Sequence, residues 1–330
     1  MKKILITGGA GFIGYHLSRR LLKDPDVSLV IVDNLQRGKK DGAFEDILKD
    51  PRVKFLNLDL TDAASYDSLG DGYAAVYHLA AVNGTKHFYR MPHEVLRINT
   101  LSLIYILEWF RKKNPGGKFC FTSSNEAYAG GLIAYGTLPI PTPEEVPLVI
   151  ADTYNPRWSY AAGKLIGELF VIHYAAQHGL RAVIVRPHNF YGPRAGYEHV
   201  IPEFSLRIAR REDPFVIFGS DETRSFCYIE DAAAAMAMLM DSPTTDGVTV
   251  ETVHIGTREE TSIGDLAERM FTVAGWRPKS VEIKKAPEGS VKRRLADISK
   301  LERMTGWKSE VSLDEGLRRT YAWYATHPAT

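Results

Sequence analysis

The chain has 330 residues, 45% hydrophobic and 25% charged, which is the balance of an ordinary globular protein able to bury a large core. Its 41 Lys and Arg residues nearly cancel its 40 Asp and Glu residues, so charge indicates neither a nucleic-acid nor an acidic-membrane partner. Two cysteines exclude a disulfide framework, and the longest apolar run, at 232–240, is too short to span a membrane. We therefore expect a cytoplasmic protein.

Short apolar runs alternate with longer helical patterns from the first residues onward. The runs are rich in β-branched and other apolar residues, which is typical of strands that are covered on both faces. The predicted strands are 4–7, 28–33, 53–56, 74–78, 117–122 and 182–186, with helical patterns that include 12–22 and 92–112. This alternation predicts an α/β fold of the Rossmann type, a doubly wound parallel sheet with helices on both sides.

The pattern changes near residue 187, after which Pro and Gly interrupt the chain more often. A helix at 229–241 is predicted to return to the first layer. A helix at 262–274, a strand at 281–284 and a helix at 312–325 are predicted to form a smaller, interleaved α/β domain. The larger domain is thus expected to hold 1–186 and about 225–247, and the smaller one about 187–224 and 248–330.

A glycine-rich turn, Gly8-Gly9-Ala10-Gly11-Phe12-Ile13-Gly14, joins the first predicted strand to the first predicted helix. Glycine at positions one, four and seven allows a tight turn and a close approach of the backbone to a diphosphate. The N–H groups at the start of the helix can then bind the phosphates. Because a strand precedes the turn and a helix follows it, the turn predicts a dinucleotide site in the larger domain.

Acidic residues at the ends of the next two predicted strands refine this site. Asp33 lies 25 residues after Gly8, where a carboxylate can accept both ribose hydroxyls and repels a 2′-phosphate. This favours NAD over NADP, although Arg37 nearby weakens the preference. Asp59 is predicted either to touch the adenine or to cap a helix.

Tyr160 and Lys164 share one face of a predicted helix because they are four residues apart. A lysine cation beside a phenol stabilises the phenolate and lowers the tyrosine pKa from about 10, which creates a base for a sugar or alcohol hydroxyl. Ser124 follows the fifth predicted strand, at the sheet edge where open α/β sheets bind ligands. We predict that Tyr160, Lys164 and Ser124 form the catalytic group.

With these residues the chain resembles the extended short-chain dehydrogenase/reductases, in the branch of NAD-dependent nucleotide-sugar epimerases and dehydratases. The resemblance covers nearly the whole chain but is not specific for a substrate. It is carried by 7–14, Asp33-Asn34, His78-Leu79-Ala80-Ala81, Asn99, Thr122-Ser123-Ser124, 160–164, 186–193, Arg224-Ser225-Phe226 with Asp231, and Gly306-Trp307. It implies that the larger domain binds NAD, that the smaller one binds a nucleotide diphosphate sugar, and that the helices at 92–112 and 156–177 join a homodimer.

The resemblance also implies individual contacts, and no metal is expected. The residues expected at NAD are Gly8, Gly11, Phe12, Ile13, Gly14, Asp33, Asn34, Asp59, Leu60, Leu79, Ala80, Ala81, Asn99, Tyr160, Lys164 and Pro187. Those expected at the substrate are Lys86, Ser124, Asn125, Glu126, Asn189, Val200, Arg224 and Arg294. Arg224 and Arg294 suit the substrate diphosphate because a guanidinium fork matches phosphate oxygens.

The expected reaction starts when C4 of the sugar gives hydride to NAD and Tyr160 takes the hydroxyl proton. Reduction of the ketone on its opposite face then inverts C4, which is the outcome we favour. Glu126 leaves C3 or C5 epimerisation, dehydration and uronate decarboxylation open, since its carboxylate can act as an extra acid or base. The same carboxylate can instead have a structural role and pair with an arginine. Asn125 replaces the Asp of the sugar 4,6-dehydratases, which argues against standard dehydration. A reductase of a keto sugar that consumes NAD(P)H is the remaining alternative.

Overall fold

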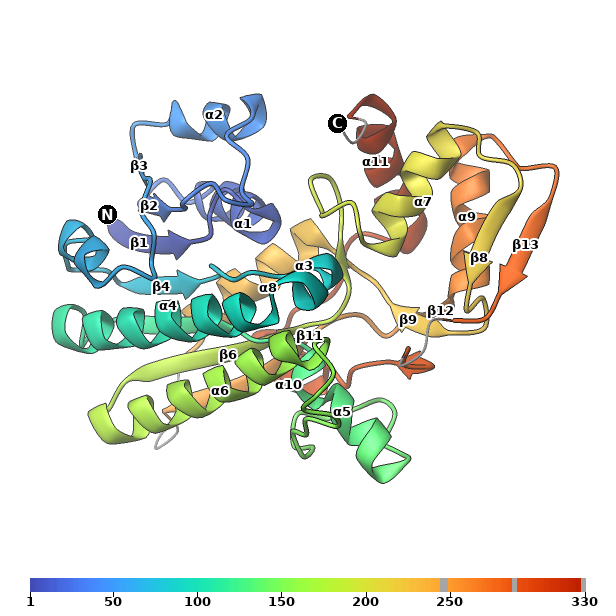
Figure 1. The fold of residues 1–330 in the computed structure, drawn as a ribbon. Helices are drawn as coiled ribbons and strands as arrows, with labels where there is room; N and C mark the ends of the chain where they lie inside the picture. The colour runs from blue at the N-terminus through green and yellow to red at the C-terminus, as the bar shows by residue number, and fades with distance from the viewer. Residues whose placement is uncertain (244–248, 287–289, 328–330) are drawn as a thin grey trace.

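The computed structural model describes residues 1–243, 249–286 and 290–327. Its described residues form a central sheet of seven parallel strands in the order β11-β6-β5-β4-β1-β2-β3 (Figure 1). The strands are β1 (Lys2–Thr7), β2 (Val27–Val32), β3 (Val53–Leu56), β4 (Ala75–His78), β5 (Lys118–Thr122), β6 (Arg181–Pro187) and β11 (Val250–Ile255). The predicted Rossmann-type α/β fold is confirmed.

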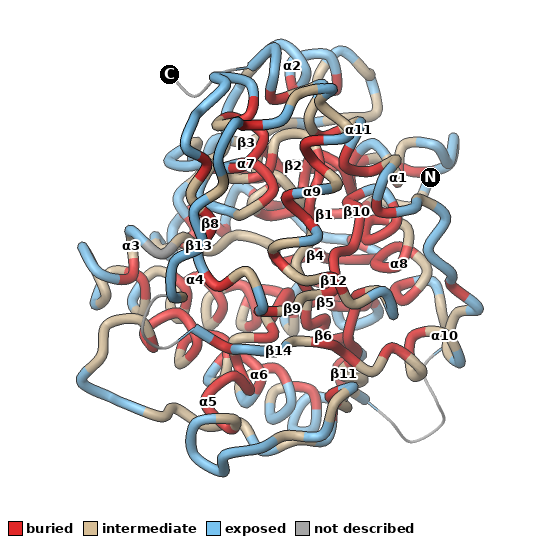
Figure 2. The backbone as a smooth tube through the Cα atoms, turned by 90° about the vertical axis from the view of Figure 1, so that its right-hand side faces the viewer, coloured by how far each residue is buried: buried red, intermediate tan, exposed pale blue. Residues whose placement is uncertain are grey.

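Alternate side chains of the strands enter two separate core layers, because successive residues of a strand point to opposite faces. On β2, Leu29 and Ile31 belong to one buried cluster, whereas Val30 and Val32 belong to the other. Helices α1 (Phe12–Leu21) and α8 (Ile229–Asp241) cover the first face, and α4 (Pro92–Lys113) and α6 (Trp158–His178) cover the second. Buried backbone therefore runs through the middle of the molecule, with exposed segments around it (Figure 2).

The register of the parallel strands brings their carboxyl ends to one edge of the sheet. Thr7 of β1 pairs with Val32 of β2 and with His78 of β4, and Thr122 of β5 pairs with Val185 of β6. The segments that follow these strands are thus neighbours in space. They begin with Gly8, Asp33, Leu79 and Ser123.

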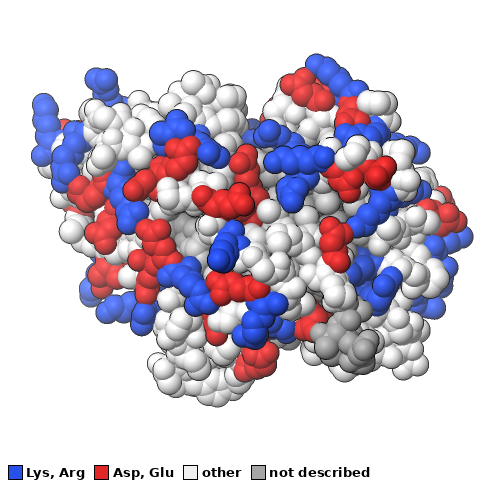
Figure 3. Space-filling view, turned by 180° about the vertical axis from the view of Figure 1, so that it is seen from behind, with Lys and Arg blue, Asp and Glu red and all other residues white. Residues whose placement is uncertain are grey.

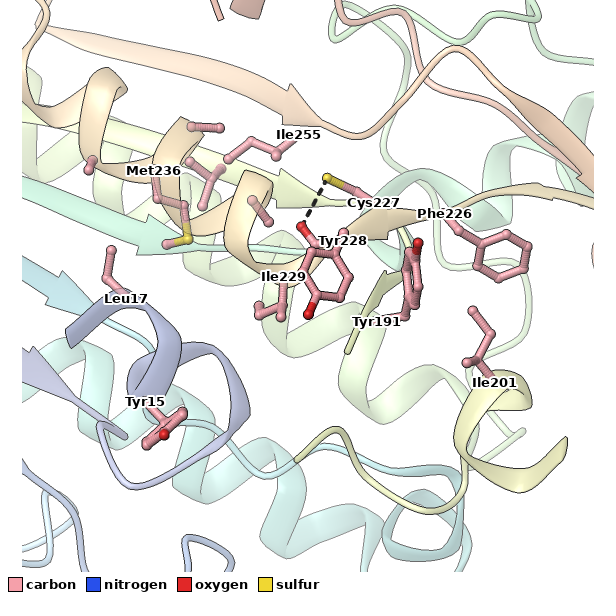
Figure 4. Close-up of a cluster of buried hydrophobic side chains, with 14 of the residues drawn as sticks. Tyr15, Leu17, Tyr191, Ile201, Phe226, Cys227, Tyr228, Ile229, Met236 and Ile255 are labelled. Carbon is pink, nitrogen blue, oxygen red and sulfur yellow. Dashed lines mark hydrogen bonds between the residues drawn. The ribbon is translucent and has the colours of Figure 1, made fainter. Parts of the chain in front are cut away.

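A smaller lobe lies beyond this edge, on the right of Figure 1. Its helices α7 (Val200–Ala209), α9 (Ile263–Ala274) and α11 (Leu313–Thr326) pack on one another. Its short strands are β7 (Phe190–Tyr191), β8 (Phe215–Phe218), β9 (Thr223–Ser225), β10 (Cys227–Tyr228), β12 (Glu260–Ser262), β13 (Val281–Lys284) and β14 (Arg293–Arg294). One apolar cluster joins this lobe to the sheet, and in Figure 4 Tyr191 lies between Ile229, at the start of α8, and Phe226.

One part of the predicted domain division is wrong. β11 lies in the central sheet, where Val250 pairs with Ala182 and Ile255 with Pro187, although 248–330 was assigned to the smaller domain. Helix α10 (Ser299–Thr305) packs on β11 and α8 as well. Without β11, the backbone groups along the edge of β6 would lack strand partners, which explains why a distant segment completes the sheet. The predicted boundary at 247 lies outside the described residues.

Four shorter helices surround the sheet edge or its flanks: α2 (Gly42–Leu48), the 3-10 helix η1 (Ala63–Ser68), α3 (Thr85–Arg90) and α5 (Glu126–Tyr135). Helix α5 begins two residues after Ser124. In the described part of the chain, no helix is both long and apolar enough to cross a membrane.

Basic and acidic side chains intermingle on the face shown in Figure 3, as the balanced composition suggests.

Candidate active site

A cavity of about 300 Å³, here called the dinucleotide groove, follows the carboxyl edge of the sheet from the glycine-rich turn to Tyr160. Most residues predicted to bind NAD line it. They are Gly8, Gly11, Phe12, Ile13, Gly14, Asp33, Asn34, Asp59, Leu60, Leu79, Ala80, Ala81, Tyr160 and Lys164. The groove thus unites segments that the sequence places up to 191 residues apart, from Gly8 to His199.

The glycine-rich turn leaves no room for a side chain at Gly8 or at Gly14. Gly8 has φ +68°, and a Cβ on it would lie 2.8 Å from the backbone nitrogen of Ala80. A Cβ on Gly14 would lie 2.5 Å from the Cα of Gly9. Gly11 caps α1 without any side-chain hydrogen bond, so the first N–H groups of the helix have no side-chain acceptor from their cap. This bare helix start fits the diphosphate of NAD.

Asp33 is buried at the groove wall and is held by the backbone. Its Oδ2 accepts a hydrogen bond from Ala10 N at 3.1 Å, and its Oδ1 accepts one from Leu35 N at 2.8 Å. Burial raises the pKa of Asp33 and these two N–H groups oppose that shift. A carboxylate fixed in this way fits the ribose hydroxyls of NAD.

A segment of the smaller lobe, residues 192–196, here called the strap, crosses to the glycine-rich turn. Arg194 lines the dinucleotide groove and forms an ion pair with Asp41, the residue that caps α2. The ring of His16 hydrogen-bonds the carbonyl of Pro193 at 3.0 Å, and the Tyr324 hydroxyl donates to the carbonyl of Ala195. The strap is therefore attached to both lobes. Arg194 was not predicted, and its only signal is its place directly after Gly192-Pro193.

The predicted catalytic residues meet at the inner end of the groove. The Ser124 hydroxyl hydrogen-bonds Tyr160. Lys164 Nζ lies 5.6 Å from the centre of the Tyr160 ring and donates to the carbonyl of Thr122 at 2.6 Å. Helix α6 and the end of β5 together position this group.

Burial has the largest effect on the pKa values of both Tyr160 and Lys164. It raises the pKa of Tyr160, while the hydrogen bond with Ser124 and the charge of Arg37 oppose that rise. It lowers the pKa of Lys164 to about 7, which the carboxylate of Glu168 partly counters. The Tyr160 pKa is therefore raised by desolvation, which is the opposite of the lowering expected from Lys164.

Glu126 is held between arginines, next to Ser124. Its Oε1 accepts a hydrogen bond from Arg294 Nη1 at 2.6 Å, and its Oε2 lies 3.6 Å from Arg157 Nη2. Its N–H donates to Ser124 Oγ at 3.2 Å. Burial favours a higher pKa, but the charges of Arg294 and Arg157 outweigh it and lower the pKa of Glu126. The pairing with arginine that the sequence left open is present.

A second cavity, of about 290 Å³, lies in the smaller lobe and shares His199 with the dinucleotide groove. Asn189, Val200 and Arg224, all predicted at the substrate, line it. Arg224 Nη2 pairs with Glu222 Oε2 at 2.8 Å, and Asn189 Nδ2 donates to the carbonyl of Ser225 at 2.9 Å. A guanidinium held by a neighbouring carboxylate is already oriented for a phosphate.

Several residues that were predicted to bind NAD or the substrate line neither of the two cavities. Asn99 is a structural amide that accepts from Val82 N at 2.7 Å and donates to Val82 O at 3.1 Å. Lys86 is exposed on α3, and Pro187 ends β6 outside the residues that line the groove. Asn125 is buried beside Ser124, with 3.4 Å between their side-chain oxygens. Unpredicted residues that line the groove include Gln36, Thr61, Ile98 and Ser102.

Comparison with known proteins agrees with this geometry. Residues 4–256 match the model of the NAD dependent epimerase/dehydratase family. The chain is 33% identical to a UDP-N-acetyl-α-D-glucosaminuronate decarboxylase of Bacillus cytotoxicus, with 98% of each chain covered. It is 31% identical to a putative UDP-glucose 4-epimerase of Methanocaldococcus jannaschii, over 99% of this chain and 100% of the relative.

Among solved structures, the UDP-glucuronic acid 4-epimerase of Bacillus cereus in complex with UDP-glucuronic acid and NAD superposes with a TM-score of 0.84. The two sequences are 25% identical, and the match covers 98% of this chain and 99% of the other. The family match, the glycine-rich turn and the groove with its fixed carboxylate lead to one conclusion. The chain is an enzyme of the NAD-dependent epimerase/dehydratase family, with NAD as its cofactor.

Proposed function

We propose that the enzyme is a nucleotide-sugar C4 epimerase. The supporting observation is that Tyr160, Lys164 and Ser124 meet at the end of the dinucleotide groove, beside a second cavity that holds Arg224. A nucleotide diphosphate in the second cavity would direct its sugar toward Tyr160. The putative UDP-glucose 4-epimerase among the relatives supports this assignment.

The roles of the side chains follow from their contacts. Tyr160 takes the proton of the C4 hydroxyl, and Ser124, which hydrogen-bonds Tyr160, donates to the sugar oxygen. Lys164, held by the carbonyl of Thr122, provides positive charge near the phenol. NAD bound in the dinucleotide groove would supply the hydride chemistry at C4. Tyr160 then gives its proton back to the C4 oxygen, so the product has the same mass as the substrate.

Uronate decarboxylation is the second candidate, and the surroundings of Glu126 favour it. Arg294 and Arg157 act on this carboxylate, and Arg224, which is paired with Glu222, adds a smaller effect. Guanidinium groups gathered in this way fit a C6 carboxylate. A uronate oxidised at C4 is a β-keto acid, which can release carbon dioxide. The decarboxylase relative from Bacillus cytotoxicus supports this alternative.

Mass spectrometry of the product formed in D₂O tests the proposal. Purified holoenzyme is incubated with a panel of nucleotide-activated hexoses, hexuronates and their N-acetyl forms. We expect an isomer of unchanged mass, with no deuterium on carbon, because C4 inversion returns the same hydride. One deuterium at C3 or C5 would assign proton transfer at that carbon and contradict simple C4 inversion. A product lighter by carbon dioxide or water, or net formation or consumption of NADH, would replace the epimerase with a decarboxylase, a dehydratase or a reductase.

We also propose a homodimer that forms through α4 and α6. Helix α6 packs beside α4 and exposes Ile166, Leu169 and Ile172, which repeat every three residues along one stripe. Leu169→Glu is therefore expected to convert a dimer into a monomer in light scattering, because it places a charge within the apolar stripe. Ile133→Glu on α5, where the side chain is also exposed, is the matched control and should leave the mass unchanged. A Leu169→Glu protein that stays dimeric would exclude this interface.

We propose that the enzyme is cytoplasmic. Cys120 and Cys227 are buried free thiols, which suits a reducing compartment.

A further inference from the structure

The ring of Tyr160 packs against a segment that has no role in the proposed chemistry. Phe88 of α3 stacks on it with 5.1 Å between the ring centres and 17° between the ring planes. Val82, Phe88, Val95 and Tyr160 form a small apolar cluster separate from both main cores. One face of the phenol is therefore covered by an aromatic ring, and Tyr160 retains only 8% of its exposure.

Helix α3 presents Phe88 inward and its neighbours outward. Lys86, Tyr89 and Arg90 are exposed, whereas Phe88 is buried. Among residues 86–90 of this helix, Phe88 is the buried side chain, and its ring contacts Tyr160. An aromatic pair of this kind prefers a defined relative orientation, so the contact restrains the plane of the phenol.

The segment that carries Phe88 is anchored at both ends. Val82 is held by the side-chain amide of Asn99 through two hydrogen bonds. At the other end, Met91 N donates to the carbonyl of His87 at 2.9 Å, and the chain continues directly into α4. Between them Gly84 has φ +112°, a conformation that favours glycine, and a Cβ there would lie 3.3 Å from Glu198 Oε2. These restraints hold Phe88 in one position relative to α4.

We propose that Phe88 is a positioning residue for Tyr160: its ring holds the phenol in the plane required for proton transfer and keeps water from one of its faces. This inference rests on the proposed role of Tyr160 as the base. It explains why Phe88, which does not line the groove, contacts Tyr160. It also gives α3 a role in positioning Tyr160, different from the substrate contact that was predicted for Lys86.

Protonation of Tyr160 responds to its whole surroundings. Burial raises its pKa, the Ser124 hydroxyl and the charge of Arg37 lower it, and the carboxylate of Glu126 raises it. Lys164 is the other charged group near the ring. Phe88→Ala changes none of these charges and admits water to the ring, so it should lower the Tyr160 pKa by reducing the cost of burying the phenolate.

The pH profile of kcat in the holoenzyme, with a substrate found in the product screen, tests the inference. For Phe88→Ala we expect kcat to fall about tenfold through loss of alignment, and the acid limb of the profile to move about one pH unit lower. Phe88→Tyr, which keeps the ring, should retain both properties. Tyr89→Ala, on the exposed side of the same helix, is the matched control and should behave as the wild type. Phe88→Leu, with more apolar bulk, replaces Phe88→Ala if that variant does not fold.

A second readout separates this inference from the proposed function. In holoenzyme labelled with ¹³Cζ-tyrosine, the Tyr160 resonance is identified by its loss in Tyr160→Phe, and it should shift in Phe88→Ala but not in Tyr89→Ala. Lower thermal stability with an unchanged pH midpoint would reduce Phe88 to a packing residue and overturn the inference. Identical profiles for the Phe88 and Tyr89 variants would do the same. Full turnover by Tyr160→Phe would instead refute the proposed function, whatever the resonance does.

Discussion

Tyr160→Phe is expected to lower kcat by about a thousandfold, the range typical of losing a positioned acid or base. The substitution removes only the hydroxyl, so the ring can keep its stack on Phe88 and its place in the apolar cluster. Ser124 would still reach the sugar oxygen, but no phenolate would accept the C4 proton. The variant should therefore fold and retain NAD while losing turnover.

The measurement compares kcat, thermal midpoint and NAD content per chain. Tyr154→Phe is the matched control because Tyr154 is 96% exposed and lies just before α6. It should equal the wild type in all three measurements. Turnover by Tyr160→Phe within a few fold of the wild type would remove Tyr160 as the base and leave another group to be found.

Glu168→Ala is expected to destabilise the protein by about 3–5 kcal/mol, because it strands a buried guanidinium. Arg186 Nη2 lies 2.7 Å from Glu168 Oε2, and the two side chains are only 4% and 2% exposed. Ser123, which directly precedes Ser124, also donates from its Oγ to Glu168 Oε1 at 2.5 Å. The pair therefore supports both the sheet and the loop that carries the site.

Denaturant unfolding gives the comparison. Glu302→Ala breaks the exposed pair between Arg258 and Glu302, 2.6 Å apart, and should cost at most about 1 kcal/mol. Replacing Arg186 and Glu168 together by Met removes both charges and should cost less than Glu168→Ala alone. A Glu168→Ala loss no larger than that of Glu302→Ala would show that the buried charge is compensated by other groups.

Local patterns in the sequence were sufficient for much of the site. The turn from Gly8 to Gly14 was recognisable because glycine spacing, a preceding strand and a following helix are all local properties. The pair Tyr160 and Lys164 was recognisable because helical periodicity places residues four apart on one face. The place of Ser124 followed from the rule that parallel strands end at one edge.

Other features depend on partners that no local pattern names. Arg294 reaches Glu126 across 168 positions, and Arg194 reaches Asp41 across 153. Which arginine pairs with a carboxylate depends on how loops from two lobes pass one another. The same holds for the strap over the glycine-rich turn and for the stacking of Phe88 on Tyr160.

The sequence alone determined six strands of the sheet and the dinucleotide turn, and it predicted Tyr160, Lys164 and Ser124 as the catalytic group, because each of these rests on the spacing of nearby residues. Only the tertiary structure decided that β11 joins the sheet, that arginines surround Glu126, and that desolvation raises the pKa of Tyr160. Strand pairing, side-chain burial and pKa values each depend on all the neighbours of a residue in the folded protein. Because folding brings these neighbours together from distant parts of the chain, no local pattern shows them.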